Sequence, residues 1–336
     1  MPRNWTDQYT FLAGALAAPG LAYFVTHEDE VAAERVPYSS FLTWRDGEWL
    51  DGGTREWPTV CLAAIPGDMT QLIAIGEGGQ VFLKGAGEER EELIVKGDEG
   101  PGTRGPLRSV RAIGGQVIVV GSDRQVYRRK GPSRWEAFDH GLRPEAVPTP
   151  KPPVEEKPKK ATGPRVRHKG PIQGAAKRHV AAASSSGFEA VDGFSATEMY
   201  AVGRLGEIWQ LDGGRWIERK SPTKETITHI TCATDGECYL ATDSGAVLIG
   251  RGERWDSLPG PVPDAVLGLR LFDGKLYAST KKGLFCREGA KFVPVAPPKK
   301  DAPKTYGALD ATRGALWSIG GKDIFTYDGK GWQRIE

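Results

Sequence analysis

The sequence predicts an all-β protein, a seven-bladed β-propeller made of four-stranded antiparallel blades. The main observation is a unit of about forty residues that recurs most clearly in three segments, which end at Trp216, Trp255 and Trp332. Each segment reads as a short apolar strand, a turn with Gly, a second apolar strand, a polar hairpin turn and a closing Trp. Four short strands at this period are typical of a propeller blade. The 44 Gly and 24 Pro residues also fit a fold with many turns.

Weaker copies of the unit extend the repeat along the rest of the chain. They close at Trp49, Trp135 and Phe292, and the least regular copy has Leu93 near the place where an aromatic residue is expected. Counting all copies gives seven units. We expect the closing aromatic residues to pack between adjacent blades and not to form a binding site.

The hairpin turns carry a second local signal. Asp-Gly pairs at Asp46-Gly47, Asp212-Gly213 and Asp328-Gly329 stand before the closing strand of three units. A tight hairpin needs positive φ at such positions, which Gly adopts without a Cβ clash. These pairs therefore place the turn between the third and fourth strands of these three blades.

One interval breaks the period, because Trp135 and Trp216 lie 81 residues apart. Residues 143–186 fill this interval with eight of the 24 prolines and few aliphatic side chains larger than Ala. Such a segment buries too little apolar surface to offset its conformational entropy. We expect a disordered or weakly ordered insertion within one propeller domain, with blades 1–3 in residues 1–142 and blades 4–7 in residues 187–336.

The charge of the chain is unevenly distributed. The insertion holds ten Lys and Arg and three Glu, so within the total of +2 the rest of the chain carries a net charge of −5. The predicted propeller is mildly acidic and bears one basic, Pro-rich arm. A general nucleic-acid-binding surface does not follow from this balance.

The N-terminal segment Phe11–Val25 has no charged residue and follows Arg3, as in a signal peptide. However, it aligns with the first two strands of a blade, and Pro19-Gly20 interrupts it. It is also too short to span a bilayer. We expect a structural first blade, no membrane span and a cytoplasmic protein; export is the alternative.

The four cysteines are Cys61, Cys232, Cys238 and Cys286, with no CxxC pair that would indicate zinc. Cys232 and Cys238 flank a predicted hairpin loop, so a disulfide across the hairpin is geometrically possible. The alternative is a reduced pair, as expected in a cytosolic protein. The sequence leaves this choice open.

The segment YAVGRLGEIWQLDGGRW, residues 200–216, resembles bacterial β-propeller repeats of the photosystem II assembly-factor and Asp-box type. The other six units match more loosely, so the resemblance covers most of the chain outside 143–186. It implies the fold, whereas propellers of this kind serve as assembly chaperones, glycan hydrolases and adaptor or immunity proteins. A full Asp box, Ser-x-Asp-x-Gly-x-Thr-Trp, is absent, which weakens the inference of a sialidase.

The sequence offers no catalytic set. The motifs G-x-S-x-G, H-E-x-x-H and the Walker loop do not occur, and no two of the five His residues are spaced for a shared metal. We therefore expect no enzyme, no metal and no cofactor.

Loop positions predict where a partner binds. In a propeller, the turns between the second and third strands lie on the same face as the connections between blades, and loops on a rigid scaffold commonly carry binding residues. The predicted partner-binding residues of this face are Glu28, Asp29, Glu30, Asp123, Arg124, Arg204, Asp243, Lys281 and Lys282, with Lys159, Lys160, Arg165 and Arg167 of the insertion.

Three functions compete for this face. We favour a monomeric, non-catalytic scaffold that binds a protein partner, as a bacterial immunity protein or an assembly factor. The first alternative is a glycan-active or small-molecule-binding propeller that uses the channel mouth. The second is nucleic-acid contact through the basic arm, which has Lys and Arg for phosphates but no interleaved aromatic residues for base stacking. A solvated arm without any partner is the simplest alternative.

Overall fold

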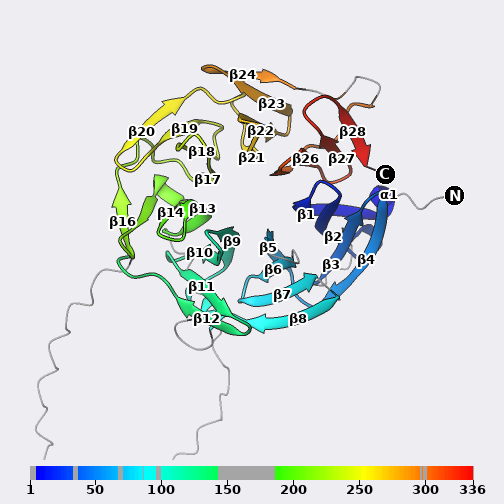
Figure 1. Cartoon of the computed structure of the whole chain (residues 1–336), viewed down its shortest axis with the longest axis horizontal. Coiled ribbons are helices and arrows are strands. Elements are labelled where there is room, and N and C mark those ends of the chain that lie inside the picture. Colours follow the sequence, from blue (N-terminus) through cyan, green and yellow to red (C-terminus); the bar gives the residue numbers. More distant parts are fainter. Residues whose placement is uncertain are drawn as a thin grey trace, which may run out of the picture.

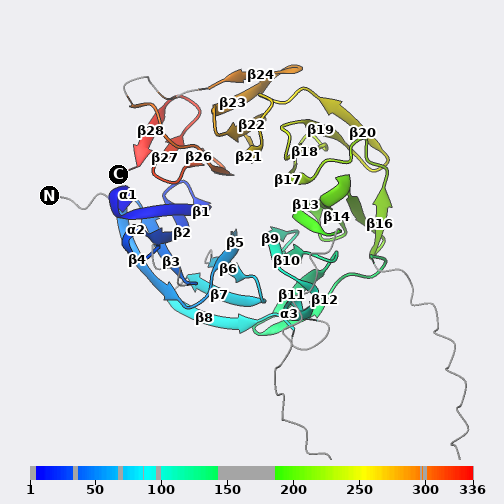
Figure 2. The same cartoon turned by 180° about the vertical axis from the view of Figure 1, so that it is seen from behind.

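Seven four-stranded antiparallel sheets stand around a central axis in the computed structural model (Figures 1 and 2). The structure describes residues 5–32, 37–66, 71–85, 87–95, 100–142, 186–295, 297 and 301–335. Within each blade the strands pair in chain order, from the inner strand at the axis to the outer strand at the rim (Figure 1). The predicted seven-bladed β-propeller is confirmed.

The first three blades precede the break in the repeat. Blade 1 contains β1 (Tyr9–Ala18), β2 (Leu21–Glu28), β3 (Ser39–Arg45) and β4 (Glu48–Arg55). Blade 2 contains β5 (Thr59–Ile65), β6 (Gln71–Gly76), β7 (Gln80–Gly85) and β8 (Glu88–Leu93). Blade 3 contains β9 (Leu107–Ile113), β10 (Gln116–Gly121), β11 (Val126–Gly131) and β12 (Arg134–Ala137).

The other four blades follow it. Blade 4 contains β13 (Phe188–Ser195), β14 (Glu198–Gly203), β15 (Ile208–Asp212) and β16 (Arg215–Arg219). Blade 5 contains β17 (Ile227–Cys232), β18 (Cys238–Thr242), β19 (Val247–Arg251) and β20 (Arg254–Leu258). Blade 6 contains β21 (Val266–Phe272), β22 (Lys275–Thr280), β23 (Gly283–Glu288) and β24 (Lys291–Pro294). Blade 7 contains β25 (Ala308–Thr312), β26 (Ala315–Ile319), β27 (Ile324–Tyr327) and β28 (Trp332–Ile335).

The few helical turns lie at strand ends. They are α1 (Trp5–Gln8), α2 (Asp29–Ala32), α3 (Pro101–Arg104) and the short η1 (Arg204–Gly206). No helix among the described residues is long and apolar enough to cross a membrane. Phe11–Val25, the uncharged segment, falls in β1 and β2 and supplies the inner half of blade 1.

The second strand of each blade is a continuous apolar run because neighbouring blades cover both of its faces. In β14, for example, Met199, Tyr200, Ala201 and Val202 are all fully buried. The hairpin turns behave as their sequences predict: Asp46 and Gly47 have φ of 48° and 97°. The local signals and the packing therefore agree.

The closing aromatic residues pack between blades, as predicted. Trp216 of β16 is 1% exposed and lies in one apolar cluster with Ile118 and Val120 of blade 3. Its indole Nε1 donates to the Phe138 carbonyl at 2.7 Å. The other closing residues likewise join the cluster shared with the preceding blade; these are Trp49, Trp135, Trp255, Phe292 and Trp332.

Blade 2 replaces the closing aromatic residue with charged groups. The second position of its outer strand is Glu89, so the aromatic position is not near Leu93, where the sequence alone placed it. The Arg55 guanidinium reaches across from blade 1, lies 3.8 Å from the centre of the Phe82 ring and pairs with Glu89 at 3.1 Å. An Arg side chain thus covers the surface that an aromatic ring covers in the other blades.

The ring closes by packing between two complete blades and not by a shared sheet. Phe24 of blade 1 and Trp317 of blade 7 have ring centres 5.9 Å apart within one apolar cluster. The Leu16 amide donates to Asp310 Oδ2 at 2.8 Å across the same seam. Both terminal blades lie side by side in Figures 1 and 2. Each blade therefore consists of consecutive strands.

The break in the repeat lies between β12 of blade 3 and β13 of blade 4, as predicted. Residues 143–185, nearly all of the predicted insertion, lie outside the described residues. This range includes Lys159, Lys160, Arg165 and Arg167, so their placement remains a prediction.

Candidate functional site: the connector face

One face of the ring carries the turns between the second and third strands together with the connections between blades; we call it the connector face. Its turns are residues 29–38, 77–79, 122–125, 204–207, 243–246, 281–282 and 320–323, of which 33–36 are not described. Turns and connections are hydrogen-bonded to each other, for example from the Asp243 amide to the Thr226 carbonyl at 3.0 Å and from the Arg204 amide to the Gly187 carbonyl at 3.0 Å. The opposite face, here called the hairpin face, carries the remaining turns.

Arg124 links the turn of blade 3 to blade 4. Its Nε and second guanidinium nitrogen donate to Glu207 at 3.0 and 2.7 Å, and its guanidinium carbon lies 5.1 Å from the centre of the Trp209 ring. The Glu207 side chain is only 7% exposed, and its hydrogen bond raises the pKa of Arg124. Arg124 thus holds two blades together and presents only part of its side chain to solvent.

Two more predicted residues, Asp123 and Arg204, are engaged with other parts of the connector face. Arg204 pairs with Glu189 at 3.1 Å. The buried Arg104 donates to the Asp123 carbonyl at 3.0 Å and pairs with its carboxylate at 3.4 Å. Each of these predicted residues therefore helps to fix the loops of the face.

Asp29 of α2 lies at the seam between blades 1 and 7. It accepts a hydrogen bond from Thr10 at 2.7 Å and forms an ion pair with Lys322. Desolvation raises the pKa of Asp29, but the hydrogen bonds from Lys322 and Thr10 outweigh it and lower the pKa overall. Asp29 fixes the start of the blade 1 turn against blade 7.

Four other predicted residues in the described part of this face have exposed side chains. Glu30, Asp243, Lys281 and Lys282 are exposed, and none forms an ion pair with another residue in the described part of the chain. Glu28 is half-buried at the end of β2, where its backbone amide donates to the Tyr38 hydroxyl at 2.9 Å. The exposed four are available for contact with a partner.

Leu205 is a residue of the connector face that sequence reasoning missed. It has φ of 57° and ψ of 24°, and 57% of the residue is exposed to solvent. A left-handed conformation costs an L-residue about 1–2 kcal/mol, and turns of this kind favour Gly, Asn or Asp. Leu205 thus combines backbone strain with an exposed apolar side chain, and ion pairs of Arg124 and Arg204 lie beside it. The available signal was the R-L-G turn, which has Leu where a turn-forming residue is expected.

The central channel is lined by the inner strands and holds opposing charges. A cavity of about 250 Å³ is bounded by residues that include Arg111, His229 and Arg270. Arg270 Nε lies 3.0 Å from Asp310 Oδ1, and Arg111 lies 3.8 Å from Asp192. Burial, assisted by Arg270, lowers the pKa of His229 to about 4, so its imidazole is neutral at pH 7. Inside the ring, the charge of Arg270 is thus balanced by Asp310 and the charge of Arg111 by Asp192.

Asp323, in the turn of blade 7, anchors the connection that precedes this blade. Its Oδ2 accepts from the amides of Lys304 and Thr305 at 3.0 and 2.8 Å, and its Oδ1 accepts from Arg334 at 2.6 Å. Desolvation raises the pKa of Asp323, but the hydrogen bonds from Arg334 and Thr305 outweigh it and the pKa is lowered overall. The ionised carboxylate is therefore the stabilising form.

We expect Asp323→Asn to reduce the free energy of unfolding by about 1.5–3 kcal/mol at pH 7, because it removes hydrogen bonds to a charged group. The folded pKa lies below the unfolded value, so this contribution is complete above about pH 4 and is lost as the pH falls further. Urea unfolding of the wild type and Asp323→Asn between pH 3 and 7 should show that the difference in their unfolding free energies becomes smaller at acidic pH. A difference that is constant with pH would contradict this assignment.

The geometry defines a class: a seven-bladed β-propeller whose loops present exposed charges and one strained apolar residue on a single face, as in a recognition scaffold. The chain belongs to the family of immune protein Tsi7 of Pseudomonas aeruginosa, to which it is 33% identical over 341 residues covering all of both chains. No protein-family model matches the chain.

Solved structures are similar in fold. The structure described as YCF48 bound to D1 peptide matches with a TM-score of 0.60 and 15% identity, over 95% of this chain and 93% of that one. The WD40 β-propeller domain of Doa1 matches with a TM-score of 0.57 and 11% identity, over 97% and 96%. The resemblance to photosystem II assembly-factor propellers is thus confirmed at the level of the fold.

Proposed function

We propose that this protein is a bacterial immunity protein, a non-catalytic scaffold that binds a toxin through its connector face. The observation that carries the proposal is the end-to-end identity of 33% with a protein named as an immune protein. A partner-binding role also fits a propeller whose loops vary while its blades repeat. We further propose that the protein is monomeric and cytoplasmic, where an incoming toxin would act.

Two observations favour the connector face over the hairpin face. It holds Leu205, an apolar side chain among ion pairs, and protein interfaces commonly place an apolar contact inside a polar rim. Ser186, the residue that follows the basic segment 143–185, also lies on this face, since its carbonyl accepts from the Asp123 amide at 3.3 Å.

The direct test is protection. A toxin gene beside the gene for this chain would be expressed in a sensitive bacterium with and without this protein. We expect growth only when both are present, and a complex of the two purified proteins on size-exclusion chromatography. Growth arrest despite soluble, folded immunity protein would contradict the proposal.

The arm is tested separately by its charge. Changing Lys159, Lys160, Arg165 and Arg167 to Gln should weaken toxin binding at low salt and flatten the dependence of Kd on ionic strength, because exposed charges are screened within about 10 Å at 0.1 M salt. The free energy of unfolding should not change. Identical Kd values for the wild type and the Gln variant at every salt concentration would show that the arm does not contact the toxin. Salt-sensitive binding of the wild-type arm to a polyanion, without binding to the toxin, would favour the nucleic-acid alternative.

A further inference from the structure

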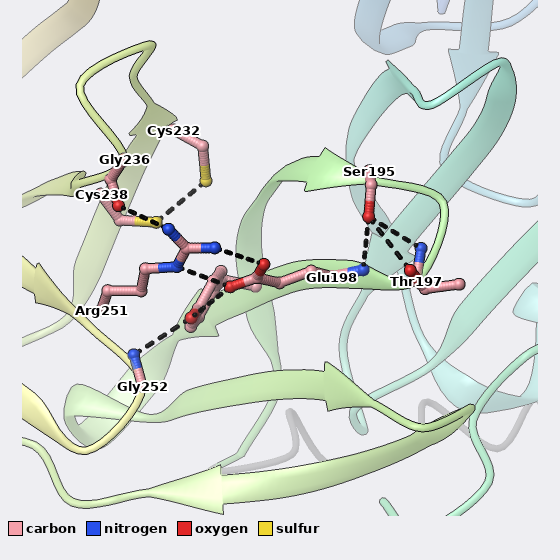
Figure 3. Close-up of polar contacts among 9 residues, drawn as sticks. Ser195, Thr197, Glu198, Cys232, Gly236, Cys238, Arg251 and Gly252 are labelled. Atoms are coloured by element: carbon pink, nitrogen blue, oxygen red, sulfur yellow. Dashed lines mark hydrogen bonds and ion pairs between the residues drawn. The ribbon is translucent and has the colours of Figure 1, made fainter.

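Cys232 and Cys238 face each other across the hairpin that joins the inner two strands of blade 5. Cys232 ends β17, Cys238 begins β18, and the two residues are directly opposite in the strand register. Their sulfur atoms lie 3.0 Å apart and point toward each other (Figure 3). Both are free thiols in the structure.

The hydrogen bonds of the hairpin place this pair in a position that a disulfide can bridge. The Ala233 amide donates to the Glu237 carbonyl at 2.8 Å, so the next pair, Cys232 and Cys238, has no hydrogen bond between its strands. The Cys232 amide points away instead and donates to Asp192 Oδ2 at 3.0 Å. In such non-hydrogen-bonded pairs the Cα atoms are about 4.5 Å apart, within the range that a disulfide bridges.

Arg251 of the same blade links the tip of the hairpin to Glu198 of blade 4. Arg251 donates to the Gly236 carbonyl at 3.2 Å and makes two hydrogen bonds to Glu198 at 2.8 and 2.6 Å (Figure 3). These contacts fix the tip of the hairpin, and the two sulfur atoms lie 3.0 Å apart before any bond forms. Forming the bond requires them to approach by about 1 Å, to the S–S length of about 2.0 Å.

We propose that Cys232 and Cys238 form a reversible disulfide, with small disulfides such as oxidised glutathione as the oxidant class. The site lies on the hairpin face, opposite the proposed toxin-binding face, and the inference does not depend on the proposed function.

The residues have distinct roles in the exchange. Cys232 is partly exposed and Cys238 is buried, so the Cys232 thiolate attacks the small disulfide and releases one thiol. Cys238 then gives up its proton and attacks the Cys232 sulfur, which releases the second thiol. Two protein thiols lose two electrons and two protons, and one small disulfide is reduced to two thiols.

The surroundings make the first step slow at neutral pH. Burial raises the pKa of the Cys232 thiol above its usual range, and the neighbouring Cys238 and Asp192 act in the same direction. Only the thiolate reacts, so the rate of oxidation should rise with pH between 7 and 9.

The test uses the full-length protein treated with oxidised glutathione, then unfolded and alkylated. We expect two of the four thiols to become unreactive, a mass loss of two hydrogen atoms, and a peptide that links Cys232 to Cys238. The oxidised protein should melt at a higher temperature, and dithiothreitol should reverse all of these changes. Four alkylated cysteines, or a stable glutathione adduct on Cys232, would overturn the proposal.

Matched variants identify the pair. The double variant Cys61→Ser, Cys286→Ser should still lose both of its remaining thiols on oxidation. Cys238→Ser should keep its thiols free or carry a glutathione adduct on Cys232, and oxidation should not raise its melting temperature. Loss of thiols in Cys238→Ser through a bond to Cys61 or Cys286 would also overturn the assignment.

Discussion

Replacing Trp216 with Ala should lower the free energy of unfolding by about 3–5 kcal/mol, the range for large aromatic residues in a core. Trp216 is 1% exposed, packs between blades 3 and 4, and donates its indole Nε1 to the Phe138 carbonyl at 2.7 Å. The substitution leaves a cavity at a blade interface and an unpaired carbonyl beside it. Chemical denaturation followed by circular dichroism measures the loss.

Ile217 supplies the matched control, because it is the next residue of the same strand and is 38% exposed. Ile217→Ala should change the free energy of unfolding by no more than about 0.5 kcal/mol. Equal losses of unfolding free energy for Trp216→Ala and Ile217→Ala would show that Trp216 does not stabilise the interface between blades 3 and 4.

Leu205→Asn should weaken toxin binding by about 10- to 30-fold, the effect of removing a central interface residue, while the free energy of unfolding rises by about 0.5–1 kcal/mol. The two effects have opposite signs because Asn tolerates the left-handed conformation that strains Leu205, whereas it lacks the apolar contact. Binding is measured by isothermal titration calorimetry, and stability by thermal and chemical unfolding.

The opposite signs separate this prediction from a simple folding defect. If Leu205→Asn lowered both stability and binding, the loss of binding could follow from misfolding of the turn. If binding were unchanged while stability rose, Leu205 would not contact the toxin. Leu205→Met, which keeps an apolar side chain, should bind nearly as well as the wild type.

The fold was predictable because each blade carries its own local signals. An apolar second strand, a hairpin turn with positive φ and a closing aromatic residue recur about every forty residues. Local patterns of this kind can be recognised directly in the sequence. Blade 2 shows where the signals fail. Its aromatic position is Glu89, and the side chain that covers this interface is Arg55, from another blade.

The site was only partly predictable. Topology places the turns on one face, so the sequence could assign Asp29, Asp123, Arg124 and Arg204 to that face, while their contact with a partner stays a prediction. Their partners were not foreseeable, because Lys322 is 293 residues from Asp29 and Glu207 is 83 residues from Arg124. Pairings at such separations depend on how blades meet, which the period does not encode.

The measurement that tests the central claim most directly compares charge reversals on the two faces for binding to the toxin. Lys281→Glu with Lys282→Glu changes the connector face, and Lys275→Glu with Arg313→Glu makes the same change in exposed positions of the hairpin face. Calorimetry should show weaker binding for the connector-face variant and an unchanged Kd for the hairpin-face variant, with both equally stable. Unchanged binding for the first variant and loss for the second would contradict the account.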